Sequence, residues 1–223
     1  MEEKKFVNVR KEEHAIKAFV KKEFGKGKIS TVKIEYTPVG EKIIVSTHKP
    51  GLVIGKRGEK IAELTEILKK RFKMENPHID ISEIKNPYFD AQLIADEIGL
   101  GLERFGSARF KAICYKTLQK IKQAGAMGAE IRASGKLPSE RAKSWRFGFG
   151  YLKKTGETSK IVDKAQSVGQ TIPGVIGIKV SILSPDKKIH DQITINDSLL
   201  NQIKQNNNRD EKKEEKIRLK KKK

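Results

Sequence analysis

The stretch Leu52-Val53-Ile54-Gly55-Lys56-Arg57-Gly58-Glu59-Lys60-Ile61 decides how the first part of this chain folds. Apolar residues run up to one glycine, two cations follow, and a second glycine precedes an amphipathic pattern. Glycine has no Cβ atom, so a loop of this kind lets the backbone approach a phosphate closely. The amides at the start of the next helix add donors and a positive dipole end. We therefore predict an exposed RNA-binding loop formed by Gly55, Lys56, Arg57, Gly58 and Lys60.

The pattern Gly-x-x-Gly is not specific by itself, and a plain turn between two helices is the alternative. Here the match extends to Val53-Ile54-Gly55-x-x-Gly58-x-x-Ile61. We expect Ile54 and Ile61 to anchor the two flanking helices in one core and to leave the loop exposed. The longer pattern and its two cations favour nucleic-acid binding over the plain turn.

Periodicity on both sides of the loop predicts a small α+β domain over residues 1–86. The expected elements are a helix over 11–24, strands over 31–36 and 42–47, a short helix before the loop, a helix over 59–72 and a strand over 78–84. This α-β-β-α-α-β order resembles the type II KH fold, in which a loop with two glycines joins two helices.

Residues 87–184 predict a second α+β domain, in which two helices cover a three-stranded sheet. The helices are expected over 88–105 and from Gly106-Ser107 to Gly125. Strands are expected over 129–134, 143–152 and 175–183, with a helix-compatible segment over 160–170. Residues 185–223 lose this periodicity and predict a flexible, charged tail, with room for a short helix near Leu199. Its last lysines either stay solvated or screen phosphates.

Aromatic side chains alternate along the middle strand of the second domain, at Trp145, Phe147, Phe149 and Tyr151. An aromatic strand of this kind is found in RRM domains, where it stacks bases. The cation expected before the first glycine is replaced by Phe147, and a partner strand motif is missing. We therefore expect these rings to pack beneath the two helices.

Charge is the strongest compositional feature of the chain. The 223 residues carry a formal net charge of +20, of which 1–86 contribute +7, 87–184 contribute +8 and the remainder +5. Basic charge spread over both predicted domains indicates a polyanionic partner. A single cysteine and four scattered histidines predict neither a disulfide nor a metal site. The absence of a long apolar run predicts an intracellular chain without a membrane span.

Several blocks in order resemble the family of small-subunit ribosomal protein number three, in its archaeal form. The blocks are Pro50-Gly51-Leu52-Val53-Ile54-Gly55, Glu75-Asn76-Pro77, Glu83-Ile84-Lys85-Asn86-Pro87, Gly128-Ala129-Glu130-Ile131-Arg132, Ser134-Gly135-Lys136-Leu137, Glu140-Arg141-Ala142-Lys143-Ser144 and Gly174-Val175-Ile176-Gly177-Ile178-Lys179-Val180. The resemblance implies a cytoplasmic protein of the small-subunit head, in the ribosome. It also implies binding to ribosomal RNA and neighbouring head proteins, a role in lining the channel by which mRNA enters, and no cofactor.

The same resemblance implies a second set of RNA-binding cations: Arg109, Lys111, Lys116, Arg132, Lys136, Arg141, Lys143 and Arg146. Many relatives carry further bases near the start of the second helix, where they are associated with unwinding structured mRNA. Ala112 and Tyr115 stand at those positions here, which weakens the expectation of an unwinding role. Each cation could instead be an ordinary solvated surface charge.

Two other classes of protein are alternatives to a ribosomal component. A free-standing KH regulator of RNA fits the loop but leaves the basic second domain unexplained. Nuclease activity on damaged DNA has been linked to relatives, but metal-dependent cleavage needs converging carboxylates, which the sequence lacks. The sequence leaves open a second mechanism of cleavage, in which a lysine forms a Schiff base with the substrate. We predict that the chain is not an enzyme.

Overall fold

The first half of the chain builds one three-stranded sheet with helices packed against it. The computed structural model describes residues 2–38, 40–72, 74, 76–187 and 189. The elements are α1 (Glu2–Phe24), β1 (Ile29–Thr37), β2 (Gly40–Thr47), α2 (Pro50–Ile54), α3 (Glu59–Phe72) and β3 (His78–Glu83). Strands β1 and β2 are antiparallel, and β2 and β3 are parallel, in the order β1-β2-β3. The predicted α-β-β-α-α-β order is confirmed.

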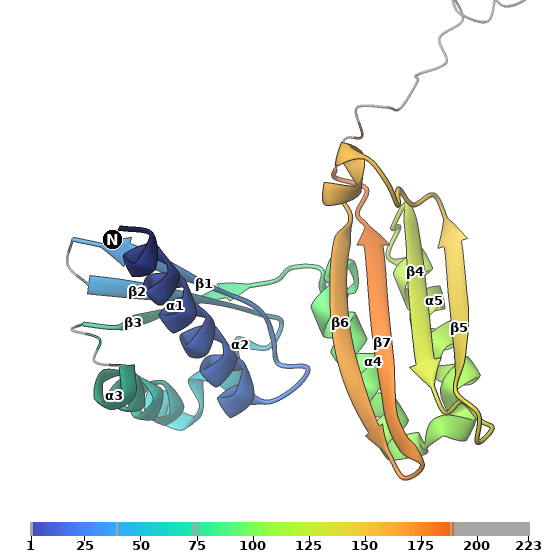
Figure 1. Ribbon diagram of the computed structural model, residues 1–223, viewed down its shortest axis with the longest axis horizontal. Coiled ribbons are helices and arrows are strands. Elements are labelled where there is room, and N and C mark those ends of the chain that lie inside the picture. The colour runs from blue at the N-terminus through green and yellow to red at the C-terminus, as the bar shows by residue number, and fades with distance from the viewer. Residues whose placement is uncertain (1, 39, 73, 75, 188, 190–223) are drawn as a thin grey trace, which may run out of the picture. The chain divides into compact units, whose positions relative to one another are not determined.

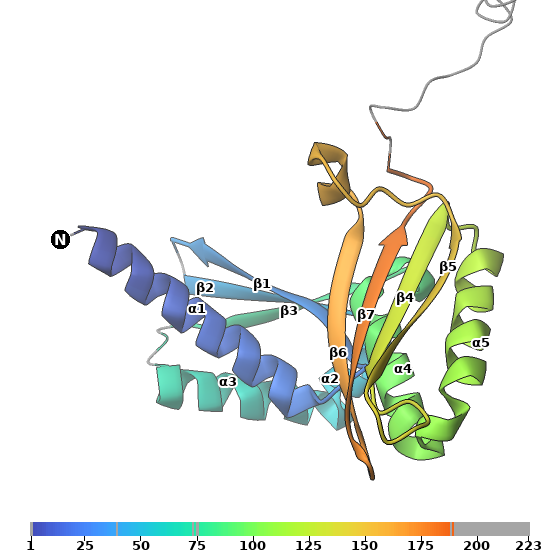
Figure 2. The ribbon, with the colours of Figure 1, turned by 45° about the vertical axis from the view of Figure 1, so that its right-hand side comes forward.

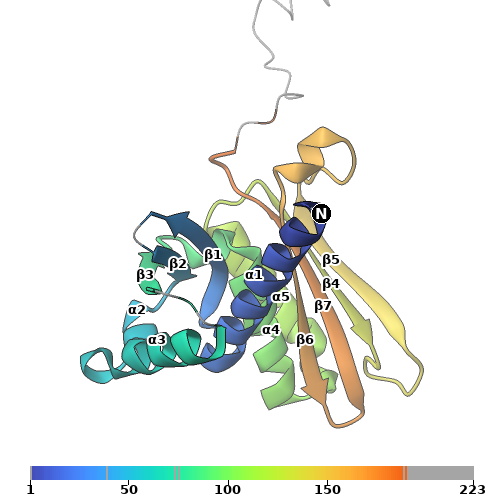
Figure 3. The ribbon, with the colours of Figure 1, turned by 60° about the vertical axis from the view of Figure 1, so that its left-hand side comes forward.

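Helices α1 and α3 share one hydrophobic core with this sheet (Figures 2 and 3). Ile43 and Val45 of β2 and Leu68 of α3 are fully buried in it, and α1 contributes Val20. Burying an aliphatic side chain of this size stabilises the fold by about 1.5–3 kcal/mol. Val53 of α2 belongs to the same core, which therefore fixes α2 and α3 on the two sides of the glycine loop.

Helix α1 begins nine residues earlier than the predicted start at residue 11. Its first turns are rich in lysine and glutamate, which favour a helix but carry no apolar periodicity. Phe6 and Val7 lie in this part and remain exposed. The early turns therefore left no periodic pattern from which they could be predicted.

The second half builds a four-stranded antiparallel sheet in the order β5-β4-β7-β6. Its elements are α4 (Ala91–Phe105), α5 (Phe110–Gln123), β4 (Gly128–Gly135), β5 (Lys143–Gly150), β6 (Asp163–Thr171) and β7 (Gly174–Leu183). Helices α4 and α5 pack on one face of this sheet, and among the described residues of this half no helix covers the opposite face (Figure 1). The α+β class is thus confirmed for both halves.

Strand β6 corrects the prediction of a three-stranded sheet with a helix-compatible segment over 160–170. Its side chains that face α4 are small, namely Ala165, Ser167 and Gly169. A Cβ atom added to Gly169 would lie 3.2 Å from the carbonyl oxygen of Gly99 in α4. Close packing between helix and strand requires small residues here, so the usual alternation of large apolar side chains is missing.

The aromatic side chains of β5 pack beneath the helices, as predicted. The ring of Phe110 in α5 lies 5.6 Å from that of Trp145 and 6.2 Å from that of Phe147. Phe149 also packs against this core. Tyr151 lies beyond the end of β5 and is exposed, so only three of the four rings belong to the covered face.

The predicted division at residues 86/87 and 184/185 stays a prediction. Most of the predicted tail, and the short helix expected near Leu199, lie outside the described residues. Among the described residues, none of the helices combines the length and apolar composition that a membrane span requires.

Candidate nucleic-acid interface

The glycine loop joins α2 to α3 through one turn of 3-10 helix over Lys56–Gly58. Gly55 ends α2 with a φ of 76°, and Gly58 has a φ of 80° just before α3. Both values lie in the region that favours glycine, which explains the residue type at both positions. Nothing lies within 4 Å of a Cβ atom built on Gly58, so the surface is open at that point.

Arg57 carries the strained backbone of the loop. Its φ is 53°, and it is the one non-glycine residue of the described chain with a positive φ. A left-handed conformation costs an L residue about 1–2 kcal/mol. Strain of this kind is concentrated at binding and catalytic sites, so Arg57 is a candidate functional residue.

The cations of the loop are available for a ligand. Lys56, Arg57 and Lys60 are exposed, and within the described residues none of them forms an ion pair. The Lys60 side chain runs across Gly55, where a Cβ atom would lie 2.9 Å from its Cγ. The structure therefore brings the five predicted residues together at this turn and in the first turn of α3, with the three cations exposed.

The apolar residues beside the loop differ from the expectation on both sides of it. In α3 the buried anchors are Leu64 and Leu68, whereas Ile61 is only half-buried and does not belong to the core. The anchor of α2 is Val53, which is fully buried, whereas Ile54 is 37% exposed. Because α2 has only five residues, a single side chain of it reaches the core. Leu52 is exposed as well, so two apolar side chains lie next to the basic loop on the surface.

The eight predicted cations of the second half are all exposed, but they occupy three separate places. Arg109, Lys111 and Lys116 lie at the start and on the surface of α5. Lys136, Arg141 and Lys143 lie in or beside the connection between β4 and β5. Arg132 and Arg146 are paired neighbours on β4 and β5, on the face without helices.

Lys111 makes a contact that no pattern in the sequence predicts. Its Nζ lies 4.5 Å from the centre of the Trp145 ring, a cation–π arrangement. Ala112 and Tyr115 are also exposed on α5, so the two positions without a base lie on the surface.

Glu130 of β4 organises the cations on the open sheet face. Its carboxylate is 3.1 Å from Arg132 Nη2, 3.0 Å from Arg146 Nε and 2.7 Å from Lys154 Nζ. The Glu130 side chain is only 10% exposed, and burial raises its pKa. Hydrogen bonds from Lys154 and Arg132 and the charge of Arg146 outweigh burial, so the pKa lies below the ordinary value of 4.5. The alternation of side chains along the strand over 128–135 places Glu130 and Arg132 on the same face. No pattern in the sequence predicts that Lys154 contacts Glu130.

We expect Glu130→Gln to remove a pH-dependent part of the stability. Because the folded pKa is lowered, the contribution of Glu130 is fully present above pH 4.5 and is lost as pH falls through the folded pKa. Urea unfolding of both proteins across this acid range should show a difference in free energy of unfolding that shrinks on acidification. Glu157→Gln, at a largely exposed site, is the control. A difference between wild type and E130Q that does not change with pH would contradict this account.

Two features of catalytic sites were compared with the described residues, a cluster of metal ligands and a reactive thiol. The described residues contain no group of three His, Cys, Asp or Glu residues that could hold a metal ion. Burial raises the pKa of the Cys114 thiol to about 11, which keeps it protonated at neutral pH.

Comparisons with known proteins agree with this geometry. The family described as KH domain matches residues 15–88, and the family described as ribosomal protein S3, C-terminal domain, matches residues 103–182. The small ribosomal subunit protein uS3 of Methanocaldococcus jannaschii is 41% identical over 196 residues, which cover 87% of this chain and 93% of the relative. The uS3 of Archaeoglobus fulgidus is 36% identical over 210 residues, covering 94% and 90% of the two chains.

The uS3 of Methanococcus maripaludis strain C5 is 34% identical over 196 residues, covering 87% of this chain and 92% of the relative. All three relatives are named as ribosomal proteins, in agreement with the prediction that the chain is not an enzyme. With one relative above 40% identity across nearly its whole length, the chain belongs to the family of the small ribosomal subunit protein uS3.

Proposed function

We propose that this chain is an RNA-binding component of the head of the small ribosomal subunit, in the cytoplasm. Its partners are the small-subunit rRNA and neighbouring head proteins. The observation that carries the proposal is the turn at Lys56–Gly58, which exposes unpaired cations between two glycines of positive φ. Phosphates can approach the backbone there, and salt-sensitive binding follows from the release of counterions.

The exposed apolar residues beside the loop suit single-stranded RNA. Leu52 and Ile54 offer apolar surface to bases that are not stacked in a duplex, while Lys56 and Arg57 contact the backbone. Contacts to phosphate position the strand, and contacts to bases add specificity. The exposed apolar and basic side chains together favour an RNA-binding loop over a plain turn between two helices.

The finer part of the proposal is a role at the channel by which mRNA enters. Arg109, Lys111 and Lys116 on α5 and the cations between β4 and β5 are exposed and suited to guiding a polyanionic strand. The uncharged Ala112 and Tyr115 on the same helix support guiding more than unwinding.

The test is the stoichiometry of the full chain with rRNA in cells. An affinity-tagged copy should co-purify with small-subunit rRNA in equal molar amounts and sediment with the subunit in a gradient. A free-standing KH regulator would instead stay near the top of the gradient at low and high magnesium. Sedimentation apart from the subunit under both conditions would overturn the proposal.

A further inference from the structure

The open face of the four-stranded sheet carries a row of cations across three strands. Strand register places Arg132 of β4 directly opposite Arg146 of β5 on one side and Lys179 of β7 on the other. Neighbouring strands are about 4.8 Å apart, so these three side chains emerge close together. Like charges directly opposite each other destabilise a sheet, so an anion bound to this row would be stabilising.

The described part of the chain supplies only partial compensation. Glu130 lies in the next row, opposite Ser181 of β7, which in turn is opposite Lys164 of β6. The carboxylate binds Arg132, Arg146 and Lys154, whereas Lys179 forms no ion pair within the described residues. Lys164 donates a hydrogen bond of 2.6 Å to the Ser159 hydroxyl, a neutral group. The single carboxylate of Glu130 lies among five cations, so this surface keeps a strong positive charge. The cations are Arg132, Arg146, Lys154, Lys164 and Lys179.

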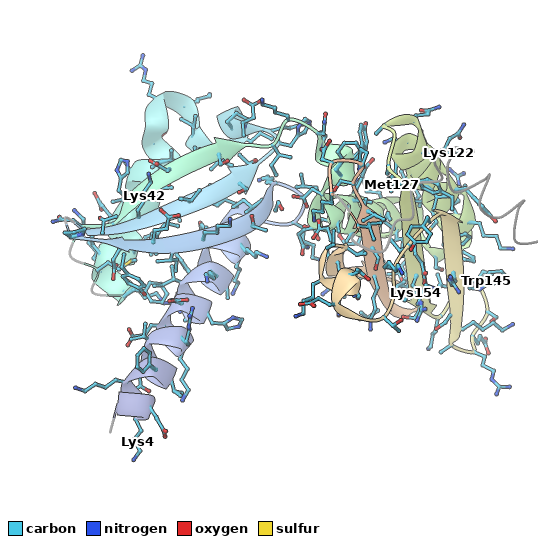
Figure 4. All side chains as sticks on the ribbon, turned by 90° about the horizontal axis from the view of Figure 1, so that it is seen from above. Lys4, Lys42, Lys122, Met127, Trp145 and Lys154 are labelled. Carbon is cyan, nitrogen blue, oxygen red and sulfur yellow. The ribbon has the colours of Figure 1, made fainter. Side chains whose placement is uncertain are left out.

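A shallow cavity marks the centre of this charge. Its volume is about 230 Å³, and its lining includes Glu130, Arg132, Lys154, Lys164, Lys179 and Ser181. That volume is several times the ~30 Å³ that a water molecule occupies in the liquid. Figure 4 shows Lys154 on the strand side of this half, away from Lys122 on the helix side. The cations therefore surround a hollow rather than a flat surface.

Donors remain for an external anion after the internal ion pairs are formed. A guanidinium has five N–H groups, and Glu130 engages Nε of Arg146 and Nη2 of Arg132. The ammonium groups of Lys164 and Lys179 are exposed. Arginines with free edges bind phosphates through two parallel hydrogen bonds. The unoccupied donors thus have the geometry for phosphate oxygens.

We propose that this open sheet face binds the sugar-phosphate backbone of RNA at a place separate from the glycine loop. The inference rests on the proposed function, because it takes the chain to be an RNA-binding protein. Phosphate contacts come from Arg132, Arg146, Lys164 and Lys179. No aromatic side chain lines the cavity, so backbone contact is favoured over base stacking.

An acidic protein segment is the competing occupant. Protein interfaces generally have an apolar core within a polar rim. The lining of this cavity is polar or charged except for Leu152, so it lacks such a core. The observations therefore favour RNA.

The test replaces two exposed cations that do not bind Glu130. We expect Lys164→Gln with Lys179→Gln, in the full chain, to lower the affinity for polyuridylate about tenfold. The slope of log affinity against log salt should become shallower by about 1.4, because two phosphate contacts to a single strand are lost. The control Lys4→Gln with Lys122→Gln makes the same change in charge at two exposed residues that do not line the cavity, and it should change the affinity less than twofold.

The outcomes separate this inference from the proposed function. If K164Q with K179Q binds polyuridylate with unchanged affinity and slope while changes in the glycine loop weaken binding, the sheet face is not an RNA site and the proposed function stands. Polyglutamate is the probe for an acidic protein segment. If the double variant loses affinity for polyglutamate but not for polyuridylate, the occupant is an acidic protein segment and the inference is wrong. If the wild-type chain does not bind polyuridylate at all, both the inference and the RNA-binding role fail.

Discussion

Reversing the two charges of the glycine loop, by Lys56→Glu with Arg57→Glu, is expected to weaken binding to small-subunit rRNA by about 100-fold. Both side chains are exposed and unpaired within the described residues, so each can donate a charged hydrogen bond to a phosphate. Such a bond is worth about 1.5 kcal/mol, which corresponds to roughly tenfold in affinity. The measurement is an rRNA-binding titration at fixed salt, followed by incorporation of the variant into subunits.

A matched control is available in α1. Lys4→Glu with Lys5→Glu makes the same change in net charge, and negative charge near a helix N-terminus is favourable. It should leave rRNA affinity within a few fold of the wild type. Circular dichroism should show that both double variants are folded. Assembly of K56E with R57E into subunits at wild-type levels would show that the loop assignment is wrong.

Phe110→Ala is expected to lower the free energy of unfolding of the second half by about 4 kcal/mol. The side chain is 1% exposed and lies against the rings of Trp145 and Phe147, so its removal leaves a cavity between α5 and the sheet. Buried Phe→Ala substitutions cost about 3–5 kcal/mol. Urea unfolding followed by the fluorescence of Trp145, the single tryptophan of the chain, measures the change directly.

The control for this variant is Phe105→Ala at the end of α4, where the ring is 60% exposed. The chemical change is identical, but little contact is lost, and the cost should stay below about 1 kcal/mol. Equal effects of the two substitutions would mean that Phe110 is not the centre of this core.

The glycine loop could be predicted because local sequence determines its shape. Gly55 and Gly58 were needed for positive φ angles, and the apolar positions around them are set by helix periodicity. The residue that anchors α2 in the core was harder to predict, because Val53 and Ile54 are adjacent and both apolar. The exact rotation of a five-residue helix depends on tertiary packing, which periodicity over so short a segment does not determine.

Strand β6 and the cation cluster could not be predicted, because both depend on contacts between distant segments. The inward side chains of β6 are small since Gly169 lies close to Gly99, a relation that no local pattern reveals. The cluster brings Glu130, Lys154 and Lys179 together from three parts of the chain. Strand alternation places each side chain on a face, but the pairing of strands decides which charges become neighbours.

Contact between the glycine loop and RNA is best measured with a photoreactive amino acid at position 57 of the full chain, by irradiation of assembled small subunits. We expect a crosslink from this position to small-subunit rRNA, because Arg57 is exposed at the tip of the loop. Crosslinks to protein alone, in subunits that contain the chain at normal levels, would contradict it.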